Sequence, residues 1–569
     1  MKKILSILVL CIMLLFVVSG CTNNSDNNKE VNDSNPITIN GDDVGGSTSA
    51  VEIADDEISS DFVLLDSNKE QVEGVNNVYT ITVAGTYKAT GKLEEGQIYV
   101  NCPEGEVEIS LEGVSISNSN VSPIFVLDCE EVTLKIKKDT LNYIYDNRNT
   151  DYSESEDDTI GKGAIYANNG DLKFSGKGTL SVTSLKNSGI HGKDNVSIKN
   201  ITLLVKAANN GIKGNDKVKI EENPTIGIVC GNNGIRTSNS DMGSKAQHGY
   251  IYIYGGTITI NSYGDGIDAE YAVEIAESTD DEGNTYTPVI DIYTNIYSSF
   301  TMENTTTTTT TANNVKSLGR RPGGGFDGGG FSGQANQEKA DDSAKGIKAN
   351  EYINISGGEI FINSYDDGLH TNNDVLETNL TASANINISG GTIKLKVSDD
   401  GIHADGNLNV DGGMIYISTS YEGLEANIIT INDGDIYVYA TDDGINSKNE
   451  LIVNGGRVDV TVSPNGDRDG IDSNGTININ GGIVITRGPN QQMAAPLDAE
   501  YGIKVSGGVL IIIGYNPRLT SSLKTSQSSN GLTKGDHVVT INDTEISYNN
   551  VTNYSGKVTV YASSSATIK

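Results

Sequence analysis

Aspartates recur along the chain, each within two residues of a glycine. The candidate metal ligands are Asp265, Asp268, Asp366, Asp367, Asp399, Asp400, Asp442, Asp443, Asp469 and Asp472. Carboxylate oxygens in flexible turns are the ligands that Ca²⁺ prefers in proteins. Stacked carboxylates repel each other by about 1 kcal/mol in water, so a row of them favours a bound cation. We therefore expect Ca²⁺ as the cofactor, although no cluster has the spacing of an EF-hand loop.

A purely structural explanation of these aspartates stays open. Asp directly before Gly is ordinary turn chemistry. That explanation accounts well for the Asp-Gly steps, but less well for the doubled aspartates and for the second acid that follows some of the glycines. Zinc is not favoured, because His370 and His403 have no third soft ligand nearby in the sequence.

Five further side chains are candidates for chemistry or for ligand binding. Lys348 lies one sequence repeat from an acidic pair on either side, and beside bound Ca²⁺ it could act as a general base. The alternative is that it only balances its acidic neighbours. We count His370 and His403, weaker candidates for a base, as substrate-binding residues together with Tyr263 and Tyr365. Exposed tyrosines spaced along a rod could stack on sugar rings, whereas a packed aromatic ladder is the alternative.

All these residues belong to one repeated unit. The sequence DGLHT at 367–371 returns as DGIHA at 400–404, and its glycine can be followed from Gly189 to Gly502. The residue after the glycine is always Ile or Leu, and the next residue is always polar. This polar column consists of His191, Lys213, Arg236, Asp268, Lys348, His370, His403, Glu425, Asn446, Asp472 and Lys504.

The repeat predicts the elements that position these side chains. Alternation of apolar and polar residues is typical of β-strands. Repeats of roughly 21 to 33 residues are in the solenoid range, and each copy must stack on the next to bury its apolar face. Since helical periodicity is missing, we expect an all-β parallel β-helix with long loop insertions. Its Ile and Leu residues would face inward and the polar column outward, and the glycines would supply positive φ in tight turns.

Acidic residues outnumber basic residues in the composition. The 75 Asp and Glu against 40 Lys and Arg give a formal net charge of −35. Such a surface repels nucleic acid and other anionic polymers, so we expect no nucleic-acid partner. An anionic ligand would need a bridging cation. The simpler alternative is that the charge only keeps the protein soluble.

The N-terminus predicts export. Residues 1–20 have the pattern of a secretory signal, with two lysines before an apolar run at 4–18. The run ends in VSGC at 18–21, which resembles a bacterial lipobox with Cys21 as the lipidated residue. We therefore expect an extracellular protein that a lipid anchors to the bacterial cell membrane.

The remaining chain divides by composition. Residues 21–54 are polar and predict a disordered tether. Residues 55–515 hold the strand-rich repeats, interrupted by a low-complexity loop at about 300–345. After the repeats stop, residues 516–569 predict a small C-terminal β cap, a separate small module being the alternative.

The chain from about residue 55 to 565 resembles bacterial extracellular carbohydrate-binding-domain proteins, which have a right-handed parallel β-helix similar to that of pectate lyases. The resemblance rests on TVAGTY at 82–87, LEGV at 111–114, the DG[IL]H repeats, the Gly-rich insert before KGI at 345–347, and the region 526–529. It implies Ca²⁺ binding and association with plant-type polysaccharides, either cellulose or acidic sugars such as polygalacturonate.

Carried over by position, the resemblance makes Asp366, Asp367, Asp399 and Asp400 calcium ligands and Lys348 the lyase-like base. The chain departs from the family at 345, where a lysine replaces the usual acid and puts a metal site in that repeat in doubt.

The sequence thus predicts a cell-surface lipoprotein that binds polysaccharide with the help of calcium. A calcium-dependent polysaccharide lyase is one alternative, and an adhesin or structural protein without a glycan ligand is another. Removal of Ca²⁺ would weaken glycan retention in the first two cases, whereas an adhesin would retain no glycan at all.

Overall fold

The computed structural model describes residue 58 and residues 60–148, 158–239, 248–295, 344–372 and 383–569. The predicted signal peptide, Cys21, the whole of the predicted tether and most of the predicted 300–345 loop lie outside the described residues. Within the described ranges the regular elements are β-strands and one 3₁₀ turn, η1 (Asp158–Ile160). In the same ranges, no helix has the length and apolar character needed to cross a membrane. The all-β prediction is confirmed.

Strands from successive repeats pair in parallel and form three columns within one sheet of 37 strands. The first column holds the repeat glycine and the polar residues after it. Its short strands are β2 (Val78–Ile81), β7 (Gly163–Ala167), β10 (Ser188–Gly192), β13 (Ile212–Gly214), β15 (Ile235–Arg236), β17 (Ile267–Ala269), β22 (Ile347–Ala349), β25 (Leu369–Thr371) and β32 (Ile471–Ser473).

The second and third columns follow in each repeat. The short strands of the second are β8 (Asp171–Gly176), β11 (Asn195–Lys199), β18 (Ala272–Ile275), β23 (Tyr352–Ile355), β26 (Asn385–Ile388), β33 (Thr476–Ile479), β35 (Gly502–Val505) and β37 (Thr520–Ser521), and β3 (Gly85–Leu93) runs from the second column into the third. Those of the third are β6 (Leu141–Asp146), β9 (Thr179–Ser184), β12 (Thr202–Ala207), β21 (Val289–Thr294), β24 (Glu359–Ser364), β27 (Thr392–Val397), β31 (Arg457–Thr461), β34 (Ile483–Arg487) and β36 (Val509–Gly514).

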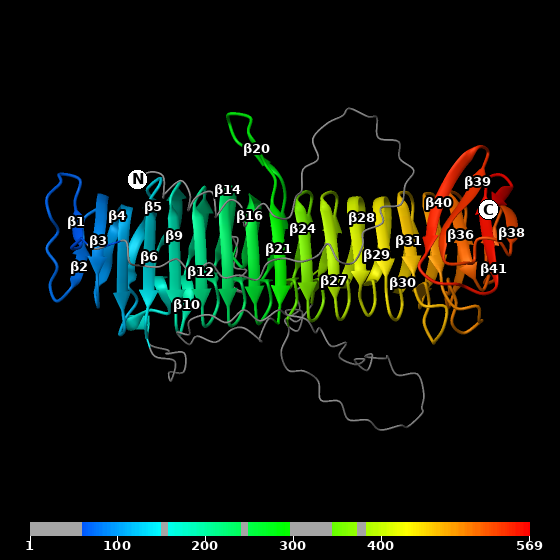
Figure 1. Cartoon of the computed structure of the whole chain (residues 1–569), viewed down its shortest axis with the longest axis horizontal. Coiled ribbons are helices and arrows are strands. Elements are labelled where there is room, and N and C mark those ends of the chain that lie inside the picture. Colours follow the sequence, from blue (N-terminus) through cyan, green and yellow to red (C-terminus); the bar gives the residue numbers. More distant parts are fainter. Residues whose placement is uncertain (1–57, 59, 149–157, 240–247, 296–343, 373–382) are drawn as a thin grey trace, which may run out of the picture.

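Long strands run through bends and contribute to more than one column. They are β4 (Gln97–Asn118), β5 (Ile124–Ile136), β14 (Lys217–Cys230), β16 (Tyr250–Ser262), β28 (Ile402–Thr419), β29 (Leu424–Tyr439) and β30 (Ile445–Val453). The result is an elongated stack in which each repeat lies beside the next along the long axis (Figure 1). Equivalent positions of neighbouring repeats are therefore about 4.8 Å apart.

The core fills the space between the columns. In most strands alternate residues are buried, and equivalent apolar residues stack from repeat to repeat, as Ile353, Ile386 and Leu408 do in the second column. Each is fully buried. Burial of one such side chain contributes about 1.5–3 kcal/mol, and the repeats extend this contribution along the whole stack.

The repeat glycine is required for a reason that the sequence interpretation missed. A Cβ on Gly368 would lie 2.5 Å from the carbonyl oxygen of Gly401 in the next repeat and 3.1 Å from Leu395 Cδ1. The backbone φ of Gly368 is not positive, so the predicted positive-φ turn is wrong here. Close approach of neighbouring backbones selects glycine. Positive φ occurs instead in the Gly-Gly pairs between the second and third columns, for example at Gly391, where φ is 84°.

The last predicted copy of the repeat is also in the wrong column. Gly502 and Lys504 belong to β35, where Lys504 pairs with Asn478 of the second column. In the first column Leu497 takes the next place, as the parallel bridge partner of Ile471. The misplacement arose because Pro496 occupies the position of the repeat glycine, so the motif was not recognisable.

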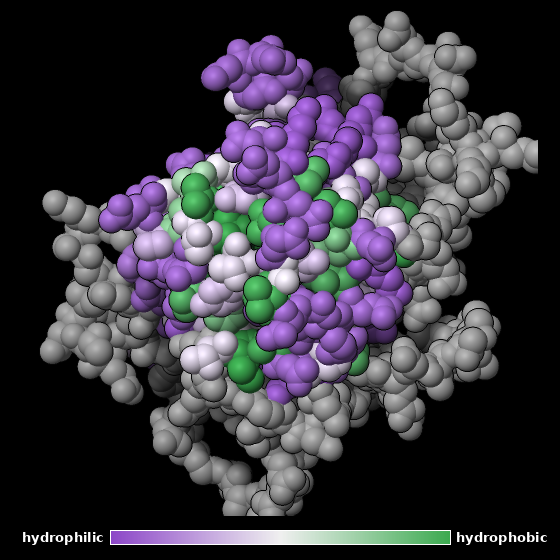
Figure 2. Space-filling model, turned by 90° about the vertical axis from the view of Figure 1, so that its left-hand side faces the viewer, coloured by the Kyte–Doolittle hydropathy of each residue, from purple (hydrophilic) through white to green (hydrophobic). Residues whose placement is uncertain are grey.

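The two ends of the stack differ. At the N-terminal end β1 (Val63–Leu65) pairs antiparallel with β3, and Figure 2 shows hydrophobic side chains scattered among hydrophilic ones over this end. Val75 and Val83 remain 71% and 66% exposed.

At the C-terminal end the segment after the repeats packs on the outer side of the third column. Its strands are β38 (Lys524–Ser528), β39 (Gly535–Ile541), β40 (Thr544–Asn550), β41 (Lys557–Ala562) and β42 (Ala566–Ile568). The β41 strand pairs antiparallel with β36, and a second apolar cluster joins Ile485 and Ile511 to Val560. Arg487, 1% exposed, forms an ion pair with Asp459 and donates a hydrogen bond to Asn550 Oδ1 at 3.0 Å.

Candidate functional site

The predicted polar column exists as a row of register partners on the first column. The row runs through His191, Lys213, Arg236, Asp268, Lys348, His370, His403, Glu425, Asn446 and Asp472. We call it the outer row. It is not uniformly exposed, because His191 and Asp268 are buried. Its chemistry changes from basic at Arg236 to acidic beyond His403.

The residues directly before the repeat glycines form a hydrogen-bonded ladder between repeats. Asp265 Oδ1 accepts a hydrogen bond from the backbone N–H of Lys345 at 2.8 Å, and Asp367 Oδ1 accepts one from Asp400 N–H at 3.1 Å. Asp443 Oδ1 accepts one from the backbone N–H of Asp469 in the next repeat at 2.7 Å. One oxygen of each carboxylate thus satisfies a buried backbone donor. The aspartates are partly structural, as the alternative interpretation held, but through contacts between repeats rather than within a turn.

Lys345 already supplies a positive charge to Asp366 and Asp367, which the sequence predicts as calcium ligands. Lys345 Nζ lies 2.6 Å from Asp366 Oδ2 and 2.7 Å from Asp367 Oδ2. Burial alone would lower the pKa of Lys345, but the two carboxylates raise it above its ordinary value. Burial alone would raise the pKa of Asp367, but His370 and Lys345 lower it. Lys345 and Asp367 are therefore both charged, and any metal ion here competes with an ammonium group.

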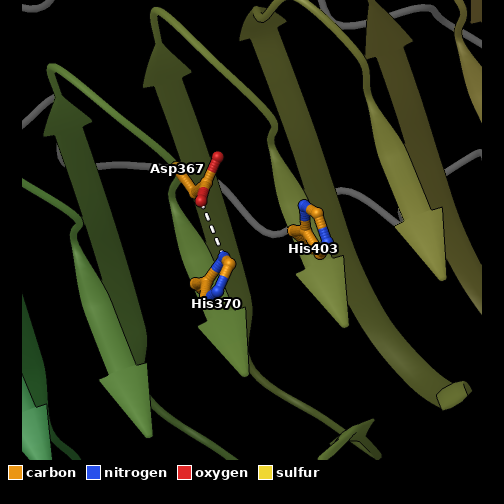
Figure 3. A group of neighbouring side chains, drawn as sticks. All are labelled: Asp367, His370 and His403. Carbon is orange, nitrogen blue, oxygen red and sulfur yellow. Dashed lines mark ion pairs between the residues drawn. The ribbon is translucent and has the colours of Figure 1, made fainter. Parts of the chain in front are cut away.

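Two histidines lie next to this pair on adjacent strands. Figure 3 shows Asp367 and His370 pointing toward each other, with His403 on the neighbouring strand. The ring centroids of His370 and His403 are 4.8 Å apart. One ligand atom from each of Asp367, His370 and His403 lies within 4.8 Å of the others. His370 Nδ1 lies 2.7 Å from Asp367 Oδ2 but is buried without a hydrogen bond of acceptable geometry. The fold thus brings a third ligand to the histidines that the sequence separates, although Lys345 shares the same Asp367 oxygen.

His403 is surrounded by carboxylates. Its Nδ1 lies 3.0 Å from Asp400 Oδ2 and 3.3 Å from Glu425 Oε2, and its Nε2 lies 3.5 Å from Asp405 Oδ1. Burial would lower the pKa of His403, but these carboxylates raise it, so the ring is a cation at neutral pH. Burial of the His370 ring lowers the pKa of His370, because this ring has fewer acidic partners to oppose the effect.

Beyond His403 the first column carries carboxylates with little compensating charge. Burial, followed by repulsion from neighbouring carboxylates, raises the pKa of Glu422 to about 9 and that of Asp443 to about 6. Burial and repulsion from acidic neighbours likewise raise the pKa of Asp469 to about 8 and that of Asp472 to about 7. A bound cation would relieve this repulsion.

Among the described residues of this stretch, Asp469, Asp472 and Asp498 form an all-oxygen group. One carboxylate oxygen from each lies within 4.8 Å of the others. Three hard oxygen donors fit Ca²⁺. Asp498 was missed in the sequence, because it follows Pro496-Leu497 rather than Gly-Ile. The signal that remained was the apolar, polar, small order of residues 497–499.

Four other predicted ligands are not brought into such a group among the described residues: Asp265, Asp268, Asp442 and Asp443. Asp268 forms an ion pair with Arg236 at 3.3 Å and accepts a hydrogen bond from Asn233 at 2.7 Å. Asp265 carries the ladder bond described above. Among the described residues, Asp442 joins no group of three metal-ligating side chains, whereas Asp366, Asp367 and Asp399 form one.

Lys348 lies between Asp268 and His370 in the outer row. Burial raises the pKa of both Asp268 and Glu270, and the positive charge of Lys348 opposes that rise. This supports the alternative in which Lys348 balances acidic neighbours.

The two predicted tyrosines stand just after strands of the third column. Tyr263 N–H donates to Cys230 O at 3.1 Å, and Tyr365 N–H donates to Thr294 Oγ1 at 3.0 Å. Both side chains are partly exposed. They come from repeats separated by the one that contains β21, so they do not form a ladder of adjacent rings.

Two known proteins are similar to parts of this chain. A carbohydrate-binding domain-containing protein of Acetivibrio thermocellus is 28% identical over 152 residues, which cover 26% of this chain and 52% of that protein. The match thus spans about half the length of that relative. A solved structure described as the polysaccharide lyase-like protein from C. thermocellum, in a gadolinium derivative, is 28% identical, with a TM-score of 0.34 over 39% of this chain and 84% of that one.

A family model described as carbohydrate-binding domain-containing protein matches residues 75–379, 376–423 and 425–569. These ranges include most of the strands of all three columns and the C-terminal segment. The resemblance drawn from the sequence is confirmed, and the chain belongs to the family of carbohydrate-binding domain-containing proteins.

Proposed function

We propose that this protein is a cell-surface lipoprotein that binds an acidic polysaccharide, such as polygalacturonate, with the help of Ca²⁺. Membership of the carbohydrate-binding family supports a polysaccharide partner in general. The three parallel columns support a right-handed parallel β-helix as the scaffold. The lipobox-like sequence at 18–21 supports lipidation at Cys21 and an extracellular location.

The observation that carries the calcium proposal is the group of Asp469, Asp472 and Asp498. Three carboxylate oxygens lie within 4.8 Å of one another, and burial with mutual repulsion raises the pKa of Asp469 to about 8. When bound, Ca²⁺ supplies a positive charge that offsets the carboxylates and offers a coordination position to a uronate carboxylate. The protein's own carboxylates hold the ion and exclude a bare anionic ligand.

Binding is favoured over lyase chemistry by the position of Lys348. Five repeat steps separate Lys348 on β22 from Asp472 on β32, which amounts to about 24 Å at the spacing of paired strands. A base at that distance cannot reach a sugar held at the Asp469 group. At the nearer pair, Asp366 and Asp367, Lys345 already occupies the place of the cation.

Isothermal titration with CaCl₂ tests the proposed metal group. The variant Asp472→Asn combined with Asp498→Asn is expected to lose at least tenfold in Ca²⁺ affinity relative to the unsubstituted chain. The matched control is Asp442→Asn, which removes an acid of the same stretch outside the group. Equal losses in the two variants would assign the affinity to diffuse negative charge and overturn the proposal.

A further inference from the structure

Two buried cysteines lie side by side in neighbouring repeats near the N-terminal end of the stack. Cys102 on β4 and Cys129 on β5 are direct register partners in a parallel pairing of strands. Their side chains are buried in the core, and both are free thiols in this structure. A pair of adjacent thiols differs chemically from a single buried cysteine, because it can be oxidised to a disulfide.

The register brings the two residues to the separation that a disulfide requires. Paired positions of parallel strands lie about 4.8 Å apart, and the Cα atoms of disulfide-bonded cysteines are usually about 4.4–6.8 Å apart. Partners in a parallel register point to the same face of the sheet. Both sulfurs accordingly lie near Gly105. Cys129 Sγ donates to the Gly105 carbonyl at 3.1 Å, and a Cβ on Gly105 would lie 3.9 Å from Cys102 Sγ.

The backbone around the two cysteines is irregular. The pairing of β4 with β5 shifts register just before them, between Val100 and Asn101, and again after them, between Cys102 and Glu106. The cysteines therefore lie at a bend and not within a regular ladder. Because such an irregularity interrupts the ladder only locally, a small adjustment that lets the sulfurs bond would leave the flanking strand pairs in place.

Burial determines when the two sulfurs can react. Burial, with a smaller contribution from the nearby Cys102, raises the pKa of the Cys129 thiol to about 11. The thiolate is the species that attacks a disulfide, so the folded, reduced chain reacts slowly with an oxidant. The bond would therefore form while the first repeats fold, before the core closes over the sulfurs.

Cys230 provides an internal comparison. It is as deeply buried as the pair, and burial raises the pKa of its thiol to about 12. Its register partners in the two neighbouring repeats are Ala207 and Ser262, which carry no sulfur. Cys230 thus shares the burial of the pair without its adjacent thiol, and it should remain reduced.

The place of the pair in the stack gives a disulfide a structural role. Repeats of this kind are held by contacts with their neighbours, so a terminal repeat has one neighbour fewer and opens most readily. The strands β4 and β5 lie near the N-terminal end (Figure 1), where Val75 and Val83 remain exposed. A covalent bond between β4 and β5 would hold the first repeats to the rest of the stack.

We propose that Cys102 and Cys129 form a disulfide that secures the N-terminal repeats. Two S–H bonds break and one S–S bond forms, while two electrons and two protons pass to an external disulfide, which becomes two thiols. Oxidants of this class act outside the cytosol, in agreement with the proposed extracellular location. The bond requires neither Ca²⁺ nor polysaccharide, so its test is independent of the proposed binding function.

The test is refolding of the full chain in a glutathione redox buffer, followed by peptide mapping. The chain is unfolded with reductant, refolded with reduced and oxidised glutathione, and then denatured with N-ethylmaleimide present. No Lys or Arg lies between Lys92 and Lys135, so trypsin releases Cys102 and Cys129 together in peptide 93–135. Trypsin releases Cys230 separately, in peptide 220–236.

The disulfide predicts that peptide 93–135 carries no maleimide and is lighter by two hydrogen atoms than after reduction. Cys230 should be labelled in the same sample. Maleimide or glutathione on both Cys102 and Cys129 of the folded, oxidised chain would overturn the proposal.

The structural role is tested by limited proteolysis of the oxidised and reduced chains. Cleavage within residues 60–148 should be at least tenfold faster in the chain refolded without oxidised glutathione. The variant Cys102→Ala should be cleaved at this faster rate in both buffers, whereas Cys230→Ala, the matched control, should behave like the unsubstituted chain. Equal cleavage rates of the oxidised and reduced chains would show that the bond does not secure the N-terminal repeats.

Discussion

Lys345 gives the sharpest test of how the buried charges are arranged. Its ammonium lies 2.6 Å from Asp366 and 2.7 Å from Asp367, and the exposed fractions of the three side chains are 11%, 14% and 3%. The substitution Lys345→Met keeps most of the apolar stem and removes the charge. Breaking a buried ion pair by removing one partner costs about 3–5 kcal/mol, because the other charge is left uncompensated. We expect the free energy of unfolding in EGTA to fall by that amount.

Calcium should reverse part of this loss. Without the ammonium, Asp366, Asp367 and Asp399 remain as three carboxylates with oxygens within 4.8 Å of one another. If Ca²⁺ binds there and its free concentration is 100 times the dissociation constant, it would restore about 2.7 kcal/mol of the free energy of unfolding. The stabilisation by Ca²⁺ should therefore be larger in Lys345→Met than in the unsubstituted chain.

The assay is urea unfolding of the full chain at neutral pH, with EGTA and with CaCl₂. Lys394→Met, at an exposed lysine of β27, controls for loss of one positive charge. If Lys345→Met is as stable as Lys394→Met in EGTA, the argument for a built-in cation is refuted. If Lys345→Met loses stability but gains nothing extra from Ca²⁺, the three aspartates do not form a latent metal group.

Three further results are expected. In EGTA, stability should fall as pH rises from about 5 to about 9, since Asp469, with a pKa of about 8, keeps in the folded state a proton that it loses when unfolded; a flat profile in denaturation scans would contradict this. Arg487→Met should cost about 1–3 kcal/mol, because buried Asn550 Oδ1 loses its donor while Asp459 keeps only its ion pair with Arg457 at 2.8 Å, and limited proteolysis should then release the C-terminal segment first. Gly368→Ala should cost about 1–3 kcal/mol through overpacking, whereas Gly227→Ala, whose added Cβ meets only Leu204 Cδ2 at 3.3 Å, should cost much less in the same thermal-unfolding assay.

The sequence was sufficient for the columns and for the outer row, because both follow from local alternation. Leu369 and His370 differ in polarity, and that difference alone predicts which side of the strand each faces. The repeat glycine was recognised, but its cause lies in the adjacent repeat, where the carbonyl of Gly401 approaches Gly368. Such a contact is not visible in a local pattern.

The candidate site was predictable only in part, for a related reason. The sequence identified Asp469 and Asp472 but missed Asp498, since a proline replaces the glycine that marked the repeat. It could not predict that Asp367 joins His370 and His403, because that grouping depends on the side chains of two repeats.

The central claim is that Ca²⁺ bound at the Asp469 group helps to retain an acidic polysaccharide. The most direct measurement is surface plasmon resonance of the full chain on immobilised polygalacturonate, with CaCl₂ and with EGTA. Absorbance of unsaturated products is followed in parallel. The account predicts that the unsubstituted chain is retained on polygalacturonate in CaCl₂ and that EGTA weakens this retention. The Asp472→Asn, Asp498→Asn variant should lose the retention and Asp442→Asn should keep it. Absorbance should not rise. Retention that is indifferent to both EGTA and the double variant would contradict it, and a Ca²⁺-dependent rise in absorbance that Lys348→Ala abolishes would replace it with a lyase.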